Sequence, residues 1–110
     1  MGYYTNYDLA VETAAPKDEL EPVVEAMKTF KPEYGKEWLY YLFCYGESTK
    51  WYEYEEDMKE FSSMFPNAIF ILTGFGEEPG DIWRAYFKNG KAQVCEAVIT
   101  YPPYDESKLK

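Results

Sequence analysis

The residues of this chain that could do chemistry are carboxylates, and most of them fall in one stretch. Between Glu47 and Asp81 there are nine acidic residues and two lysines, so this stretch carries −7 of the net charge of −9. Two groups stand out, one in a predicted helix start and one in a predicted turn: Glu53, Glu55, Glu56 and Asp57, then Glu77, Glu78 and Asp81. Clustered carboxylates can keep a surface solvated, bind a divalent cation, or attract a basic surface of another protein.

These three interpretations of the carboxylates stay open from the sequence. The spacing of the carboxylates is not that of an EF-hand loop, and we assign none of them as a metal ligand. A surface that imitates nucleic-acid phosphate would occupy a basic groove on a partner protein.

Other chemistry-bearing residues do not form a catalytic set. The chain has no histidine, which excludes an imidazole base and the usual serine triad. Cys44 and Cys95 lie far apart and are interpreted as small core residues, while Ser62 and Ser63 are placed on a polar helix face. The GFGEEPG run at 74–80 lacks the spacing of a dinucleotide loop. We therefore predict a protein that is not an enzyme and has no cofactor.

The composition also disfavours some classes of binding partner. The acidic balance and the single arginine, Arg84, argue against direct nucleic-acid binding and against anionic membranes. No apolar run approaches the roughly 20 residues of a membrane span, and the first residues lack the pattern of a signal peptide. These features predict a cytoplasmic protein.

The elements that would position the carboxylates follow from hydrophobic periodicity. Residues 3–13 alternate as a half-buried strand, and 38–45 (WLYYLFCY) are apolar on both faces, which favours a central strand. Helical spacing with acidic starts predicts helices from about Asp18 to Phe30 and from Glu53 to Phe65. A third strand is expected over 68–75.

The remaining residues predict a hairpin. Asn89-Gly90 is the signature of a type I′ turn, so strands are expected over 81–88 and 91–101, with Lys88 opposite Lys91. Residues 102–110 read as a loose tail.

Together these elements predict one α+β domain spanning residues 1–110. The expected fold is a two-layer ferredoxin-like sandwich, with a mostly antiparallel sheet of about five strands and two helices on one face. The other sheet face would carry aromatic residues or a partner, the aromatic candidates being Trp38, Tyr40, Tyr41 and Trp83.

The predicted lengths place the two acidic groups together. The second helix should be about 18–20 Å long at ~1.5 Å per residue, and the strand after it about 25 Å at ~3.3 Å per residue. Because the strand turns back along the helix, its end should return to the acidic start of the helix.

Three runs of the sequence resemble a group of known proteins. KWYEYEEDM (50–58), GFGEEPGDIWRAYFKNGK (74–91) and YDESKL (104–109) are similar to small acidic proteins of phages, prophages and related mobile elements, grouped with ferredoxin-like domains of the YubB type. The resemblance implies a ferredoxin-like fold, a cytoplasmic setting and a mobile-element origin, and carries over no catalytic residue. Small acidic phage proteins often block host defence systems such as CRISPR effectors and restriction enzymes.

The leading hypothesis is a non-enzymatic acidic binding protein of phage type. It would be an anti-defence inhibitor, of the anti-CRISPR or anti-restriction class, that engages a basic nucleic-acid-binding surface of a host protein. One alternative is a small-ligand-binding or sensing domain that uses the aromatic sheet face. A second is a homo-oligomeric structural module, with a homodimer as its simplest form.

Overall fold

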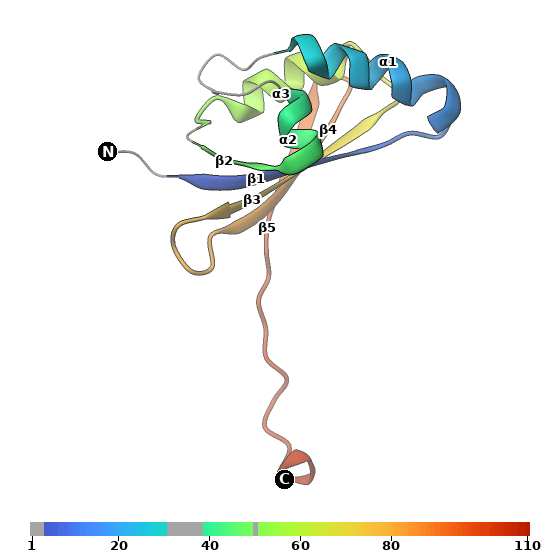
Figure 1. The fold of residues 1–110 in the computed structure, drawn as a ribbon. Helices are drawn as coiled ribbons and strands as arrows, with labels where there is room; N and C mark the ends of the chain where they lie inside the picture. Colours follow the sequence, from blue (N-terminus) through green and yellow to red (C-terminus); the bar gives the residue numbers. More distant parts are fainter. Residues whose placement is uncertain (1–3, 31–38, 50) are drawn as a thin grey trace.

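In the part of the chain that the structure describes, one antiparallel sheet carries three α-helices on a single face, as Figure 1 shows. The computed structural model describes residues 4–30, 39–49 and 51–110. The strands lie in the order β2-β1-β3-β4-β5. In chain order the elements are β1 (Thr5–Glu12), α1 (Pro16–Thr29), α2 (Leu39–Tyr45), β2 (Glu47–Thr49), α3 (Tyr54–Ser63), β3 (Ile69–Gly76), β4 (Ile82–Lys88), β5 (Lys91–Glu96) and the short 3₁₀ turn η1 (Glu106–Lys108).

The α+β two-layer arrangement expected from the sequence is confirmed, and four of the five predicted strands are present. In β1, Thr5, Tyr7 and Leu9 are buried while the residues between them are exposed, which is the alternation of a strand covered on one face. Both predicted helices also form, as α1 and α3.

The predicted central strand over 38–45 is wrong, because Leu39–Tyr45 forms helix α2. Leu39 and Leu42, three residues apart, are buried on one side, and Tyr41 and Tyr45 are exposed with ring centroids 5.1 Å apart. An apolar run of this length does not distinguish a strand from a buried helix by periodicity. Trp38 lies outside the described residues.

Strand β2, which the sequence did not predict, sits at the sheet edge beside β1. Because β1 is antiparallel to both β2 and β3, those two strands run parallel to each other, and α3 connects them. This is one split βαβ unit, whereas the ferredoxin-like order β-α-β-β-α-β would contain two. The other would need a strand where α2 stands.

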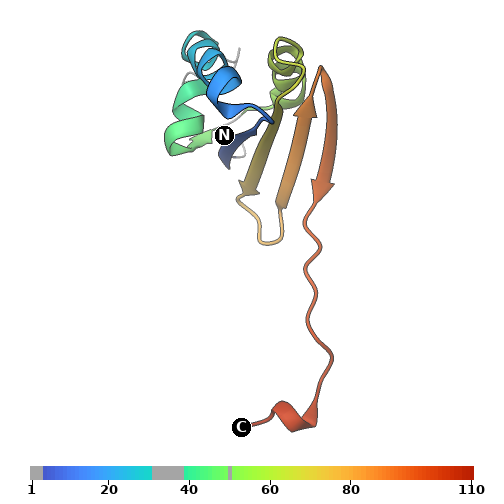
Figure 2. The same ribbon diagram turned by 90° about the vertical axis from the view of Figure 1, so that its right-hand side faces the viewer.

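The predicted hairpin is present with the predicted register. Asn89 and Gly90 both have positive φ angles, of 49° and 77°, as a type I′ turn requires, and Lys88 lies opposite Lys91. Strand β5 ends at Glu96 instead of Tyr101, because β4, its only partner strand, begins at Ile82. Residues 97–110 then run away from the sheet, as Figures 1 and 2 show.

The core lies between the sheet and the helices. Met58 and Phe61 on α3 are fully buried, as the predicted helical stripe requires, and Phe65 is half-buried beside them. Phe61 contacts Phe30 and Phe70 edge to face, with ring centroids 5.0 and 5.3 Å apart. The core therefore fixes α3, and with it the acidic start of that helix, against the sheet.

Candidate binding surface at the acidic end

The structure brings the two acidic groups to the same end of the sheet. Strand β3 ends at Gly76, and α3 runs back along the sheet toward the start of β3, so the first turn of α3 lies near the β3–β4 turn (Figure 1). A cleft of about 220 Å³ between them is lined by Tyr52, Tyr54 and Asp81. We call this region the acidic end; its residues are Glu53, Glu55, Glu56, Asp57, Glu77, Glu78 and Asp81.

An aromatic cluster lies directly beneath the acidic end. Tyr54 at the start of α3 stacks on Trp83 of β4, with ring centroids 4.6 Å apart. Tyr7 of β1 contacts Trp51 and Trp83 edge to face, at 5.4 and 6.0 Å. Such ring pairs stabilise by about 0.5–1.5 kcal/mol each beyond the burial of their area. The cluster thus connects both acidic segments to the sheet.

Gly74 explains why Trp83 can lie across the sheet. The two residues are directly opposite each other in the β3–β4 ladder. A Cβ atom on Gly74 would stand 2.3 Å from the indole ring, so only glycine leaves room for the ring there. The sequence pattern alone identified the 74–80 run as a turn and missed this role of its first residue.

Contacts within the protein engage Asp57, Glu55 and Glu77 of the acidic end. Asp57 accepts a hydrogen bond from the indole Nε1–H of buried Trp51 at 2.7 Å, so its carboxylate holds α3 to the aromatic cluster. Glu55 pairs with Lys59 at 3.3 Å, and the Glu77 carboxylate accepts the backbone N–H of Tyr4. These contacts reduce what Glu55 and Asp57 can offer to a partner.

Glu53, Glu56, Glu77 and Glu78 are the most exposed carboxylates of the acidic end. Glu55 and Glu56 also lie in the first turn of α3, where negative charge is favoured by the helix dipole. No side chain caps this helix start.

Two tyrosine hydroxyls of the cluster are hard to ionise. Burial raises the pKa of Tyr7, whose hydroxyl donates to the Trp51 carbonyl at 3.2 Å. Burial also raises the pKa of Tyr54, and the negative charge of Glu55 adds to the effect. Both groups therefore stay neutral, which suits a structural role better than acid–base catalysis.

Some sequence interpretations of other candidate residues are wrong. Cys44 is exposed on α2 instead of lying in a core strand, and Cys95 is half-buried; both are free thiols. Ser62 is fully buried rather than on a polar face, and its hydroxyl accepts the backbone N–H of Gly90 at 3.0 Å. Within the described ranges, no group of three or more Cys, Asp or Glu residues is placed to hold a metal ion.

The three described residues of the predicted aromatic sheet face, Tyr40, Tyr41 and Trp83, lie elsewhere. Tyr40 and Tyr41 belong to α2, where Lys28 lies over the Tyr40 ring at 5.2 Å from its centroid. Trp83 points toward the helix side, into the aromatic cluster. Trp38, the fourth candidate, is outside the described residues.

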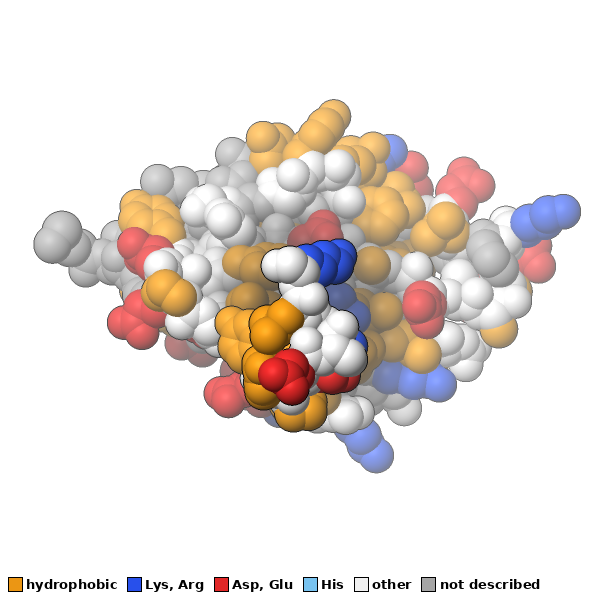
Figure 3. Space-filling model, turned by 90° about the horizontal axis from the view of Figure 1, so that it is seen from below, with side chains coloured by type: hydrophobic (Ala, Val, Ile, Leu, Met, Phe, Trp, Pro, Cys, Tyr) orange, Lys and Arg blue, Asp and Glu red, His pale blue; other side chains and the backbone are white. Residues whose placement is uncertain are grey.

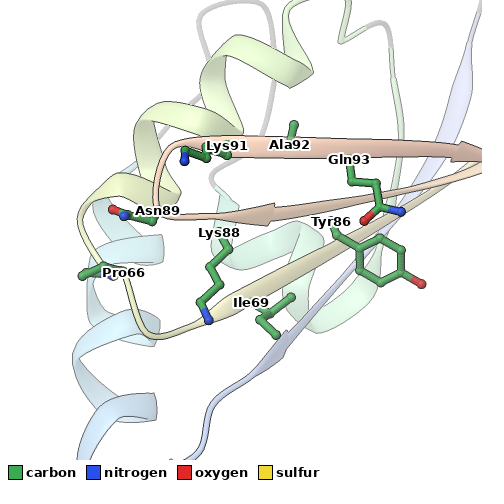
Figure 4. A pocket seen from close by; sticks show the side chains of 8 residues that line it. All are labelled: Pro66, Ile69, Tyr86, Lys88, Asn89, Lys91, Ala92 and Gln93. Carbon is green, nitrogen blue, oxygen red and sulfur yellow. The ribbon is translucent and has the colours of Figure 1, made fainter.

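The sheet face without helices has a mixed surface. Figure 3 views the molecule from below, with the C-terminal residues nearest the viewer, and hydrophobic side chains are interspersed with charged ones over the visible surface. A depression of about 570 Å³ on this face lies near the hairpin turn and is lined by Ile69, Tyr86, Lys88, Lys91 and Gln93 among others. Figure 4 shows Tyr86 and Gln93 side by side from neighbouring strands, with Ile69 and Lys88 next to them.

Among the described residues, no helix has the length and apolar character needed to cross a membrane. Comparison with known proteins adds no relative: no family model, curated protein or solved structure matches this chain.

Proposed function

We propose that the protein is a non-enzymatic binding protein that uses its acidic end to engage a basic, nucleic-acid-binding surface of another protein. One observation carries this proposal. Two acidic segments separated by about twenty residues of sequence come together at one end, over a common aromatic cluster. A fixed, concentrated negative surface attracts a basic groove and speeds association with it.

The biological setting belongs to the same proposal. Two of the three runs that resemble small acidic phage and mobile-element proteins contain all seven residues of the acidic end. In that setting the protein acts as an anti-defence inhibitor, and its partner is a host effector whose groove otherwise holds DNA or RNA.

The test reverses acidic residues whose side chains are exposed. Glu53, Glu56 and Glu78 are exposed, so their reversal to lysine removes surface charge while Asp57 keeps its hydrogen bond to Trp51. Loss of the favourable dipole contacts at the start of α3 should cost only ~0.3–1 kcal/mol per charge. The variant should therefore stay folded.

A matched control reverses the same number of charges at the opposite end of the sheet. The control residues are Glu12, Asp18 and Glu21, which are all exposed. Glu12 marks the opposite end of the sheet because it pairs with Ile69 at the start of β3. Both triple variants change the net charge equally, so a difference between them reports position rather than total charge.

The experiment captures partners from bacterial lysate on each immobilised protein, then tests the captured protein for competition by DNA and RNA. We expect the wild type and the control to retain a nucleic-acid-binding partner that the acidic-end variant loses. Binding should weaken between roughly 50 and 200 mM salt. A partner that holds nucleic acid and this protein together, with no salt dependence, would contradict the proposal.

Ligand binding on the open sheet face is a second candidate function. The observation in its favour is the depression near the hairpin, where Lys88 and Lys91 lie opposite each other above apolar Ile69. Both lysines line this depression, and their positive charge suits an anionic ligand. Thermal stabilisation by small organic anions that is lost in Lys88→Ala would support this function, and no shift with any of them would count against it.

A further inference from the structure

The segment that follows β5 has the character of a strand but no strand beside it. Residues 98–101 read Val-Ile-Thr-Tyr, all residues that favour β-structure. The last hydrogen bond that ties this segment to the sheet is Ala97 N–H to the Ile82 carbonyl, at 2.9 Å. We call residues 98–101 the overhang.

The overhang exposes its apolar side chains almost completely. Val98 and Tyr101 are each 87 % exposed and Ile99 is 59 % exposed. Figures 1 and 2 show the chain continuing the line of β5 away from the domain at this point. A contiguous exposed apolar segment of this kind marks an interaction surface.

The overhang does not turn back onto its own sheet. No Gly, Asn, Asp or Pro occurs between Glu96 and Tyr101 to form a turn. Pro102-Pro103 follows and ends any ladder, since proline has no N–H to donate. A strand that pairs with the overhang would therefore have to come from another chain.

The outer edge of β5 suits a second copy of this protein as the other chain. Strand β5 is the last in the sheet order, so no described strand pairs with its outer edge, and it leads directly into the overhang. Two copies arranged antiparallel about a two-fold axis would pair each overhang with the β5 edge of the other copy. A single symmetric contact then covers both free edges and both overhangs.

Side-chain pairing favours a particular register. A two-fold axis at Glu96 would place two carboxylates directly opposite each other, which is destabilising. An axis at Ala97 instead places Ile99 opposite Cys95, and Tyr101 opposite Gln93, of the second copy. We propose that the protein forms a homodimer through antiparallel pairing of β5 and the overhang, with the two sheets joined into one.

This dimer has a salt dependence of its own. Because Glu96 pairs with Trp83 and Ala97 bonds to Ile82, β5 ends beside the acidic β3–β4 turn. Pairing there brings the acidic ends of both copies toward each other. Association should therefore strengthen as salt screens the repulsion, which is opposite to the salt dependence expected for binding a basic partner.

The test measures mass and thermal stability in solution with proline variants. Adjacent residues of a strand direct their N–H groups to opposite edges, so either Ile99 or Thr100 donates toward the partner strand. The double variant Ile99→Pro/Thr100→Pro removes both N–H groups and therefore removes that donor. Ser107→Pro/Lys108→Pro, beyond the proline pair, is the matched control. The overhang has no ladder contact with its own domain, so both variants should fold.

We expect the wild type and the control to show twice the 12.9 kDa chain mass in sedimentation experiments at about 0.3 M salt. Their melting temperatures should rise with protein concentration over roughly 5 to 500 μM. The overhang variant should be monomeric, with a melting temperature independent of concentration. A wild type that is monomeric over this range, or an overhang variant that dimerises as well as the control, would overturn the proposal.

Discussion

Phe61 is the residue whose loss should cost the most in the core. It is fully buried on α3 and contacts the rings of Phe30, directly after α1, and of Phe70 on β3. Truncation to alanine removes these contacts and leaves a cavity, so Phe61→Ala should lower the free energy of unfolding by about 3–5 kcal/mol. Denaturant unfolding measures the loss. Met64→Ala, at the exposed end of the same helix, is the control and should change stability by less than about 1 kcal/mol.

Gly74 and Trp83 form a pair that can be tested as a unit. A methyl group at position 74 overlaps the indole ring, so Gly74→Ala should push Trp83 away from Tyr54. Overpacking of this kind costs about 1–3 kcal/mol, and the near-ultraviolet circular dichroism of the aromatic cluster should change with it.

A double-mutant cycle separates this clash from a general effect of the substitution. With Trp83→Ala already in place, the alanine at position 74 meets no ring, and it should then be neutral or slightly stabilising because alanine has less backbone entropy to lose than glycine. Equal costs of Gly74→Ala in both backgrounds would show that the ring does not depend on the glycine.

At the scale of elements, two neighbouring serines of α3 should behave differently. Ser62 is buried and accepts the backbone N–H of Gly90, which ties the helix to the β4–β5 hairpin. Ser63 is exposed and bonds only within its helix, to the Glu60 carbonyl. Ser62→Ala should therefore cost about 1 kcal/mol or more, since a hydrogen bond between elements is lost.

Ser63→Ala should cost nothing measurable, because alanine favours the helix and no contact between elements is lost. Thermal or denaturant unfolding of the two variants provides the comparison. If both serines gave the same small change, the hairpin would not be held through Ser62.

The elements also show how far the sequence could predict the structure. Strand β1, helix α3 and the hairpin were predictable because alternation, helical spacing and Asn89-Gly90 each select one geometry. Helix α2 was not, because a seven-residue apolar run fits either a strand or a buried helix. Strand β2 has only three residues, too few for a pattern to show.

Two errors of prediction have a tertiary cause. The strand expected to reach Tyr101 ends at Glu96, because its partner strand β4 begins at Ile82 and offers no residue beyond that point. Nothing in residues 91–101 indicates where β4 begins. For the acidic end, matched lengths of helix and strand predicted the approach of the two segments. The engagement of Asp57 by Trp51 could not be predicted, since it depends on side-chain placement.

At the scale of the whole molecule, folding concentrates negative charge that the extended chain keeps apart. Four acidic residues of 53–57 meet three of 77–81, which gives twelve new pairs of like charge. For scale, two like charges about 12 Å apart in water repel by roughly 0.3 kcal/mol. The dipole at the start of α3 offsets about 0.3–1 kcal/mol for each acid in its first turn. Because the repulsive pairs outnumber the acids in that turn, we expect repulsion to exceed the dipole contribution at low salt.

Salt should consequently stabilise this protein. Raising the ionic strength from about 0.01 to 0.15 M shortens the screening length from roughly 30 to 8 Å, which removes much of the repulsion between the two segments. The free energy of unfolding, measured by urea denaturation of the monomeric Ile99→Pro/Thr100→Pro variant, should rise by about 1 kcal/mol or more.

Adding Glu53→Gln, Glu56→Gln and Glu78→Gln should raise stability at low salt and reduce the gain from added salt, because fewer repulsive pairs remain to be screened. Neutralising Glu12, Asp18 and Glu21 in the same way should leave the salt gain almost unchanged, since those residues lie at the other end of the sheet. A stability that falls with added salt would mean that the helix dipole and the Glu55–Lys59 pair outweigh the repulsion at the acidic end.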